Sequence, residues 1–178
     1  MVKRGLIPVK NKKMANKGKD FEKEVIKANL FYKDSGQALI QKISTQWNIV
    51  RRGKEIIDAY PEGKSTLDFR GTIRGGIPIS FDCKETLEHK GLPLANIEPH
   101  QIQYMKDAIL VNETTFILCH LKKIDKKYYI PGETVIDYWN LWQENKGKVG
   151  FNFIPVEEME EIFFNEYYLL DYLQVIEI

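Results

Sequence analysis

The chain has 178 residues, of which 43% are hydrophobic and 12% aromatic, so one globular domain can bury a core without disulfides or structural metal. Its two cysteines, Cys83 and Cys119, each lie in an apolar run, which favours reduced core thiols over a clustered zinc site. The chain has neither an apolar run of membrane-spanning length nor a hydrophobic signal core, so we expect a cytoplasmic protein that does not contact membranes.

The net charge of +1 conceals an asymmetry between the two ends of the chain. Residues 1–19 carry seven Lys/Arg and no acid, whereas residues 155–178 carry seven acids and no Lys/Arg. We interpret residues 1–16 as a basic flexible arm and residues 17–178 as a single domain. The basic segment, including Lys17 and Lys19, suits contacts with DNA phosphates, and it is equally compatible with a solubilising leader.

The first regular element is a helix from Gly18 to about Lys33. It presents an apolar stripe at helical spacing, made of Phe21, Val25, Ala28 and Tyr32. Glu22 borders this stripe, where it is either an ordinary surface acid or a ligand reaching a metal at the edge of a sheet. Residues 38–43 then read as a strand, with an irregular continuation over residues 44–49.

A compact basic segment follows, containing Arg51, Arg52 and Lys54, and it leads through residues 56–60 to a turn at residues 61–63. Basic side chains beside an exposed Trp47 would suit a projection that contacts DNA, because arginine holds phosphates and an aromatic ring stacks on bases. A solvated hairpin whose tryptophan belongs to the core explains the same pattern equally well.

The chain is organised around residues 64–86, which read as two strands joined by a glycine turn. Alternation in the first strand predicts Thr66, Asp68 and Arg70 on one face and Leu67 and Phe69 on the other.

In the second strand, alternation places Ser80, Asp82 and Lys84 opposite an apolar face. Two carboxylates and an ammonium on neighbouring strands suit a divalent metal with a phosphate nearby. The spacing of an acid two residues before a lysine also occurs at Glu62/Lys64, Glu88/Lys90, Asp125/Lys127 and Glu144/Lys146, and we expect these four pairs to be solvated surface charges.

The second half alternates helices and strands. We expect a loop over residues 87–97, a helix from Pro99 to about Leu110 with Gln101 and Tyr104 on one side, and a buried central strand at 115–121. Another strand ends at Ile130. A helix from Glu133 to about Asn145, a helix-like segment at residues 156–164 and an apolar segment at residues 167–175 complete the chain.

Six blocks of sequence carry a family resemblance. They are G-K-D-F-E from Gly18, Q-K-I-S-T from Gln41, S-T-L-D-F-R-G from Ser65, F-D-C-K-E-T from Phe81, P-L-A-N-I from Pro93 and H-Q-I-Q-Y-M from His100. In order and spacing they resemble the RecU Holliday junction resolvases of Gram-positive bacteria and their phages.

The resemblance implies an α/β fold with a restriction-endonuclease-like core: a central mixed β-sheet flanked by helices, with a projecting stalk at about residues 45–60. It implies a homodimer that cuts four-way DNA junctions with Mg²⁺, for which Mn²⁺ is a candidate substitute. Branched DNA is the implied substrate, and a RecA-type recombinase is a further candidate partner.

Site roles follow from the matching motifs. Thr66, Asp68, Asp82 and Gln101 match metal-binding positions, and Lys84 matches a lysine that stabilises the transition state. Glu22 is a further candidate catalytic residue. The stalk would carry Arg51, Arg52 and Lys54 to the DNA, and Arg70 is a further candidate DNA contact.

Two positions depart from the family pattern. Asp82 stands where the family usually has glutamate, and Gln46 follows Thr45 where the family has proline. Two other functions remain alternatives. One is a nuclease of the same fold acting on another DNA structure, and the other, which Asp82 keeps open, is an inactive nuclease fold that binds DNA or regulates a recombinase.

Overall fold

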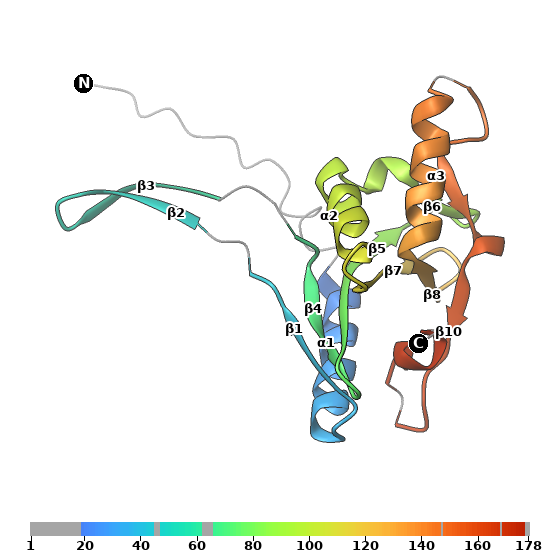
Figure 1. Cartoon of the computed structure of the whole chain (residues 1–178), viewed down its shortest axis with the longest axis horizontal. Helices are drawn as coiled ribbons and strands as arrows, with labels where there is room; N and C mark the ends of the chain where they lie inside the picture. The colour runs from blue at the N-terminus through green and yellow to red at the C-terminus, as the bar shows by residue number, and fades with distance from the viewer. Residues whose placement is uncertain (1–18, 45–46, 62–65, 147, 168, 177–178) are drawn as a thin grey trace, which may run out of the picture.

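The structure, a computed structural model, describes residues 19–44, 47–61, 66–146, 148–167 and 169–176 (Figure 1). The predicted arm at residues 1–16, Lys17 and most of the turn expected at residues 61–63 lie outside the described residues. None of the helices within these ranges has the length and apolarity needed to cross a membrane.

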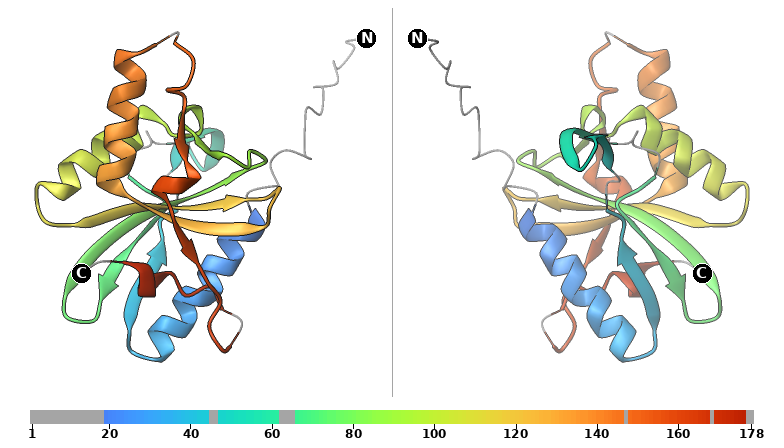
Figure 2. Two further views of the ribbon diagram at one scale, coloured as in Figure 1. Left: turned by 90° about the vertical axis from the view of Figure 1, so that its right-hand side faces the viewer. Right: turned by 90° about the vertical axis from the view of Figure 1, so that its left-hand side faces the viewer.

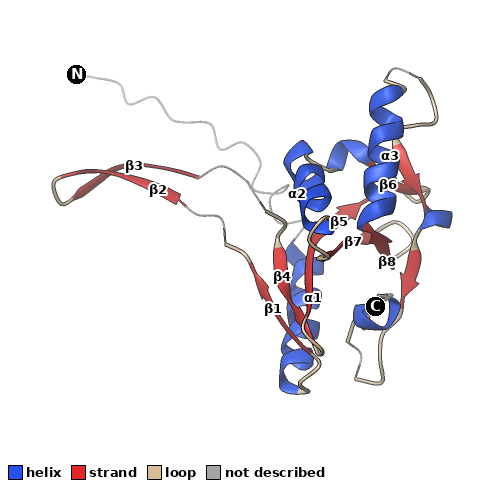
Figure 3. Cartoon of the chain, viewed as in Figure 1, coloured by secondary structure: helices blue, strands red, loops and turns tan. Residues whose placement is uncertain are grey.

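The described part of the chain begins with a helix that six strands follow, and two further helices lie among the last four strands (Figure 3). The elements are α1 (Lys19–Asp34), β1 (Ala38–Lys42), β2 (Trp47–Arg52), β3 (Glu55–Pro61), β4 (Phe69–Ile73), β5 (Ile77–Thr86), β6 (Gly91–Pro93), α2 (Pro99–Ile109), β7 (Thr114–Leu121), β8 (Lys126–Pro131), α3 (Gly132–Glu144), β9 (Phe153–Pro155) and β10 (Glu160–Ile162), with short 3₁₀ turns at Leu94–Asn96, Val156–Glu158 and Tyr172–Val175. The helices expected after Gly18, at Pro99 and at Glu133 are confirmed within one residue at each end.

A six-stranded mixed sheet in the order β1-β4-β5-β7-β8-β10 forms the centre of the molecule. Only β5 and β7 pair in parallel within it; its other neighbours are antiparallel. Helix α1 covers one face of the sheet, and α2 and α3 cover the other (Figure 2). The predicted α/β class with a sheet between helices is confirmed, and the arrangement is consistent with a restriction-endonuclease-like core.

The face covered by α1 is built on aromatic side chains. The predicted stripe of α1 is buried throughout, from Phe21 to Tyr32. On the sheet, Phe69, Phe81 and Phe116 are cross-strand neighbours on β4, β5 and β7. Their rings stack, with centroids 4.9 Å and 4.6 Å apart. Each such pair adds about 0.5–1.5 kcal/mol beyond the burial of its area, so the stack holds the three strands in register.

Strands β2 and β3 form a separate two-stranded hairpin that projects from the ends of β1 and β4 (Figure 1). Its described side chains are exposed, including the large apolar Ile49, Ile56 and Ile57. The projecting stalk is therefore confirmed. The segment at residues 47–49, expected to be irregular, is the first half of β2.

Two expectations for the second half of the chain are wrong. The expected loop at residues 87–97 contains the short strand β6, which pairs with β9 more than 50 residues later. The expected helix at residues 156–164 is a 3₁₀ turn followed by β10, which pairs with β8 and buries Ile162. In both cases a partner distant in sequence overrides the local preference.

We predict that Phe81→Ala lowers the free energy of unfolding by about 3–5 kcal/mol, because it removes the middle ring of the stack and leaves a cavity in a fully buried layer. Denaturant unfolding followed by circular dichroism measures the change. As a control, Leu30→Ala on the exposed side of α1 should alter stability by no more than about 0.5 kcal/mol. Equal losses for the two variants would contradict the importance of the stack.

Candidate active site

Strand β5 places two charged residues of the candidate site. Side chains alternate along it, so Phe81 and the half-buried Cys83 pack on the α1 side, while Asp82 and Lys84 point to the α2 side. Asp82 is only 1% exposed and Lys84 is 16% exposed, and Lys84 Nζ lies 2.6 Å from Asp82 Oδ2. The predicted pairing of acid and lysine on one face of this strand is confirmed.

Asp68 approaches from the residue just before β4. Its backbone N–H donates to Asp82 Oδ1 at 3.3 Å, which ties the two acidic residues together. The expectation that Leu67 and Phe69 share a face is wrong: Leu67 packs on the α2 side and Phe69 on the α1 side. Because β4 begins at Phe69, strand alternation does not extend back to Leu67.

Gln101, in the first turn of α2, joins the two charged groups. Its Nε2 donates to Asp82 Oδ2 at 2.8 Å, and its Oε1 accepts from Lys84 Nζ at 3.0 Å. The same oxygen accepts from the backbone N–H of Glu98 at 2.9 Å, as part of a capping box at the start of the helix. In this arrangement Gln101 orients Asp82 and Lys84, and its role as a metal ligand stays a prediction.

The electrostatics of the site are set by the two neighbouring acids. Burial raises the pKa of Asp68 to about 7, with further contributions from Asp82 and Glu22, and Lys84 opposes the rise. A cation bound beside Asp68 would favour its ionised form and so lower this pKa.

Glu22 on α1 lies close enough to Asp68 to influence its pKa, as the border position on the apolar stripe suggested. It forms an ion pair with Lys42 of β1, a residue that our sequence reasoning did not identify. The Lys42 ammonium also lies 5.9 Å from the centre of the Phe69 ring. The sequence offered a sign of this role for Lys42, because strand alternation places it on the same face as the buried Ala38 and Ile40.

The other candidate residues lie around this centre. Thr66 is half-buried two residues before Asp68, and Arg70 points to the α2 side, where it meets the buried Glu113. The exposed stalk carries Arg51, Arg52 and Lys54. Lys17 lies outside the described residues, and for Lys19 only the helical backbone is described.

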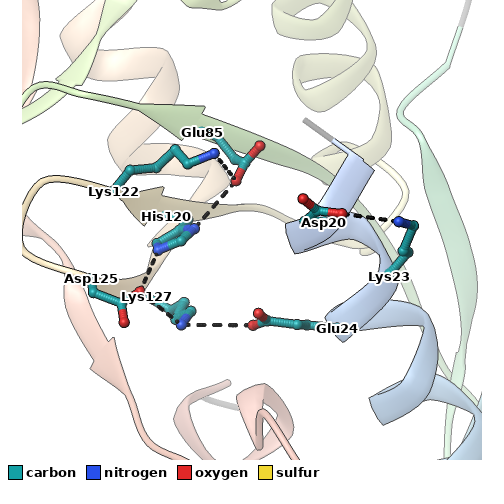
Figure 4. Close-up of polar contacts among 8 residues, drawn as sticks. All are labelled: Asp20, Lys23, Glu24, Glu85, His120, Lys122, Asp125 and Lys127. Atoms are coloured by element: carbon teal, nitrogen blue, oxygen red, sulfur yellow. Dashed lines mark hydrogen bonds and ion pairs between the residues drawn. The ribbon is translucent and has the colours of Figure 1, made fainter. Parts of the chain in front are cut away.

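A second charged network lies on the opposite side of β5 (Figure 4). Glu85 follows Lys84 and points the other way, where its Oε1 lies 3.1 Å from Lys122 Nζ and 3.3 Å from His120 Nδ1. His120 Nε2 continues the network to Asp125 at 2.9 Å. This network holds the end of β5 that carries Lys84.

We expected Asp125 and Lys127 to be solvated surface charges, and for Lys127 this expectation is wrong. Lys127 is 7% exposed and lies between Asp125 and Glu24 of α1, with Nζ to carboxylate distances of 3.3 Å and 3.7 Å (Figure 4). A lysine is buried in this way only when carboxylates surround it. The spacing alone gives no sign of this burial, because Glu24 comes from a distant helix.

The arrangement can hold a divalent cation through carboxylate oxygens of Asp68 and Asp82, and it offers Lys84 to an anionic group. Within the described ranges, no three His, Cys, Asp or Glu side chains gather as a metal-binding group. Further ligands would therefore be neutral oxygens of the kind that Thr66 and Gln101 carry, which suit hard cations such as Mg²⁺.

Known proteins with similar sequences share one description. The family described as "Recombination protein U" (RecU) matches residues 16–178. The Holliday junction resolvase RecU of Streptococcus uberis is 32% identical over 149 residues, which covers 78% of this chain and 73% of the relative. The proteins of the same name from Streptococcus equi subsp. equi and Streptococcus pneumoniae serotype 19F are 33% and 31% identical, covering 74% and 84% of this chain and 68% and 75% of their own.

The raised pKa of Asp68 predicts a pH-dependent loss of stability. Between pH 3.8 and about 7 the unfolded chain releases this proton while the folded protein retains it, so stability falls as pH rises through this window. We expect a fall of about 2 kcal/mol, after allowing for solvent screening of a partly exposed group.

The free energy of unfolding is measured in EDTA across this pH range for the unmodified protein and for Asp68→Asn. The difference between the two isolates the contribution of Asp68 from those of other acids. The variant should gain stability relative to the unmodified protein as pH rises. Parallel pH profiles for the two proteins would show that Asp68 keeps an ordinary pKa.

Proposed function

The chain belongs to the RecU family of recombination proteins, and we propose from this premise that it resolves four-way DNA junctions by metal-dependent hydrolysis of phosphodiester bonds. The observation that carries the proposal is the contact of Asp68 with Asp82, beside Lys84 and Gln101, at the base of a projecting basic hairpin. A protein that only binds DNA gains nothing from two acids facing a phosphate, because they repel it.

The proposed metal is Mg²⁺, with Mn²⁺ as a substitute, held by Asp68 and Asp82 with Thr66 and Gln101 as further oxygen ligands. When bound, the ion would supply a water of lowered pKa and offset the negative charge of the transition state. The electrostatics of Asp68 support this assignment: burial, and after it the charge of Asp82, raise its pKa, and a bound cation would favour the ionised carboxylate.

The side chains of the protein have complementary roles in the proposal. Lys84 stabilises negative charge on the phosphate that is attacked. Before metal binds, Gln101 holds Lys84 and Asp82 in place through hydrogen bonds, and its oxygen would exchange such a bond for the metal. Glu22 of α1, paired with Lys42, contributes to the raised pKa of Asp68.

Selectivity for the junction would come from the stalk and from pairing of two chains. The exposed Arg51, Arg52 and Lys54 lie on a hairpin that projects beyond the body, where they can reach phosphates near the branch point (Figure 1). A homodimer would present two sites related by a twofold axis to a nearly twofold-symmetric junction. The proposed place of action is the cytoplasm, and a RecA-type recombinase is a proposed partner.

We predict that Asp68→Asn lowers junction cleavage by at least about 100-fold. Junction binding should be unchanged or tighter, because one carboxylate that repels phosphate is gone. The assay compares strand-by-strand cleavage of an immobile four-way junction with that of a linear duplex, in Mg²⁺, Mn²⁺ and EDTA. Asp34→Asn, at the exposed far end of α1, is the matched control.

Cleavage by Asp68→Asn at the control rate would refute the site. Tight junction binding without cleavage by the unmodified protein in either metal would favour the inactive binding module. Equal cutting of linear duplex would favour a general endonuclease.

We predict that replacing Arg51 and Arg52 together with alanine weakens junction binding and reduces its salt dependence. Each lost phosphate contact lowers the slope of log K against log salt by about 0.9, so the slope should fall by about 2. Titrations of labelled junction in EDTA at several salt concentrations give the slope. Replacing Lys27 and Lys33, two exposed lysines of α1, removes the same charge away from the stalk and should leave the slope unchanged. If both double variants behave alike, the stalk does not bind DNA.

A further inference from the structure

A buried carboxylate outside the proposed metal site is surrounded by hydrogen-bond donors. Glu113, only 6% exposed, precedes β7. Its Oε1 accepts hydrogen bonds from Ser80 Oγ and, at 3.2 Å, from the Tyr104 hydroxyl. The two hydroxyls lie 3.1 Å from one another. Its Oε2 lies 3.4 Å from Arg70 Nη2, so Glu113 joins a buried polar group to a surface cation.

This cluster continues the polar surface of the site along the sheet. Ser80 lies two residues before Asp82 on β5 and is the cross-strand neighbour of Arg70 on β4. Tyr104 lies one turn after Gln101 on α2. A shift of two residues along a strand is about 7 Å, and it keeps side chains on the same face. Arg70 therefore stands beside the paired acids on the surface where the cleaved strand would lie.

The Arg70 guanidinium contacts Glu113 through one nitrogen, while much of the side chain stays exposed to solvent. Its side chain is 57% exposed, although one of its nitrogens faces a buried carboxylate. A guanidinium has five N–H donors in a planar fork, so a contact with Glu113 leaves donors that can bind a phosphate. An arginine whose rotamer is already restricted loses less conformational entropy when it binds.

Two hydroxyl groups fix the Glu113 carboxylate that restricts the Arg70 side chain. Ser80 and Tyr104 donate to one oxygen of the carboxylate, which fixes its orientation and leaves the other oxygen for Arg70. A buried acid needs such partners to offset its desolvation. The cluster thus holds one acid in place and directs it toward one exposed cation.

We propose that Glu113, held by Ser80 and Tyr104, is a positioning residue that presents Arg70 to a DNA phosphate next to the one that is cleaved. The inference rests on the proposed function and adds a second phosphate-binding position to the same site. Glu113 acts only through Arg70 and does not touch the DNA.

The test is a double-mutant cycle with Arg70→Ala, Glu113→Gln and the combined variant. Junction dissociation constants are measured in EDTA at several salt concentrations, and KM and kcat for cleavage in Mg²⁺. Arg74→Ala is the control, because Arg74 is an exposed arginine just beyond the opposite end of β4. Tyr104→Phe removes one donor to Glu113 while keeping the ring, and it serves as a second variant if Glu113→Gln does not fold.

We expect Arg70→Ala to raise the dissociation constant about tenfold and to lower the salt slope by about 0.9, with a larger effect on KM than on kcat. Glu113→Gln and Tyr104→Phe should weaken binding less, and neither should have any further effect once Arg70 is alanine. The Arg74→Ala variant should bind as the unmodified protein does.

An unchanged salt slope for Arg70→Ala would overturn the proposal. So would a loss of binding from Glu113→Gln or Tyr104→Phe that persists in the Arg70→Ala background, since it would show a general effect on the fold. These outcomes are distinguishable from failure of the proposed function, because Asp68→Asn tests the latter separately. If Asp68→Asn is inactive while Arg70→Ala binds normally, only the positioning role is lost.

Discussion

The two-residue side-chain period of β5 is the constraint on which the rest of the structure depends. It directs Phe81 into the aromatic stack under α1 and Asp82 and Lys84 to the opposite face. A slip of one residue would exchange these faces, burying charge in the stack and exposing the rings. The stack therefore stabilises the sheet and also fixes the register of the site.

Around this strand, the charged residues are arranged so that each buried one has a partner. Asp82 contacts Lys84 and Gln101, Glu113 contacts Arg70, and Lys127 lies between two acids on the other face. Asp68, which is partly exposed, differs from these residues: burial and the neighbouring Asp82 and Glu22 raise its pKa, and Lys84 offsets the rise only in part. Carboxylates perturbed in this way are characteristic of sites that bind a cation or carry out chemistry.

Asp82, where the resemblance leads us to expect glutamate, makes close polar contacts in this structure. Although aspartate reaches less far than the usual glutamate, its carboxylate still meets Lys84 at 2.6 Å and Gln101 at 2.8 Å. The capping box of α2 holds Gln101 at this carboxylate. The other departure, at Gln46, lies outside the described residues.

The sequence by itself determined the elements whose signal is local: the stripe of α1, the glycine turn between β4 and β5, the proline start of α2 and the acid and lysine on one face of β5. Periodicity and turn chemistry act between near neighbours, so a single chain reveals them. Only the tertiary structure decided the strands β6 and β10, the ion pair of Lys42 with Glu22 and the cluster at Glu113. Each depends on a partner 20 or more residues away, and no local pattern encodes which distant residue will lie opposite.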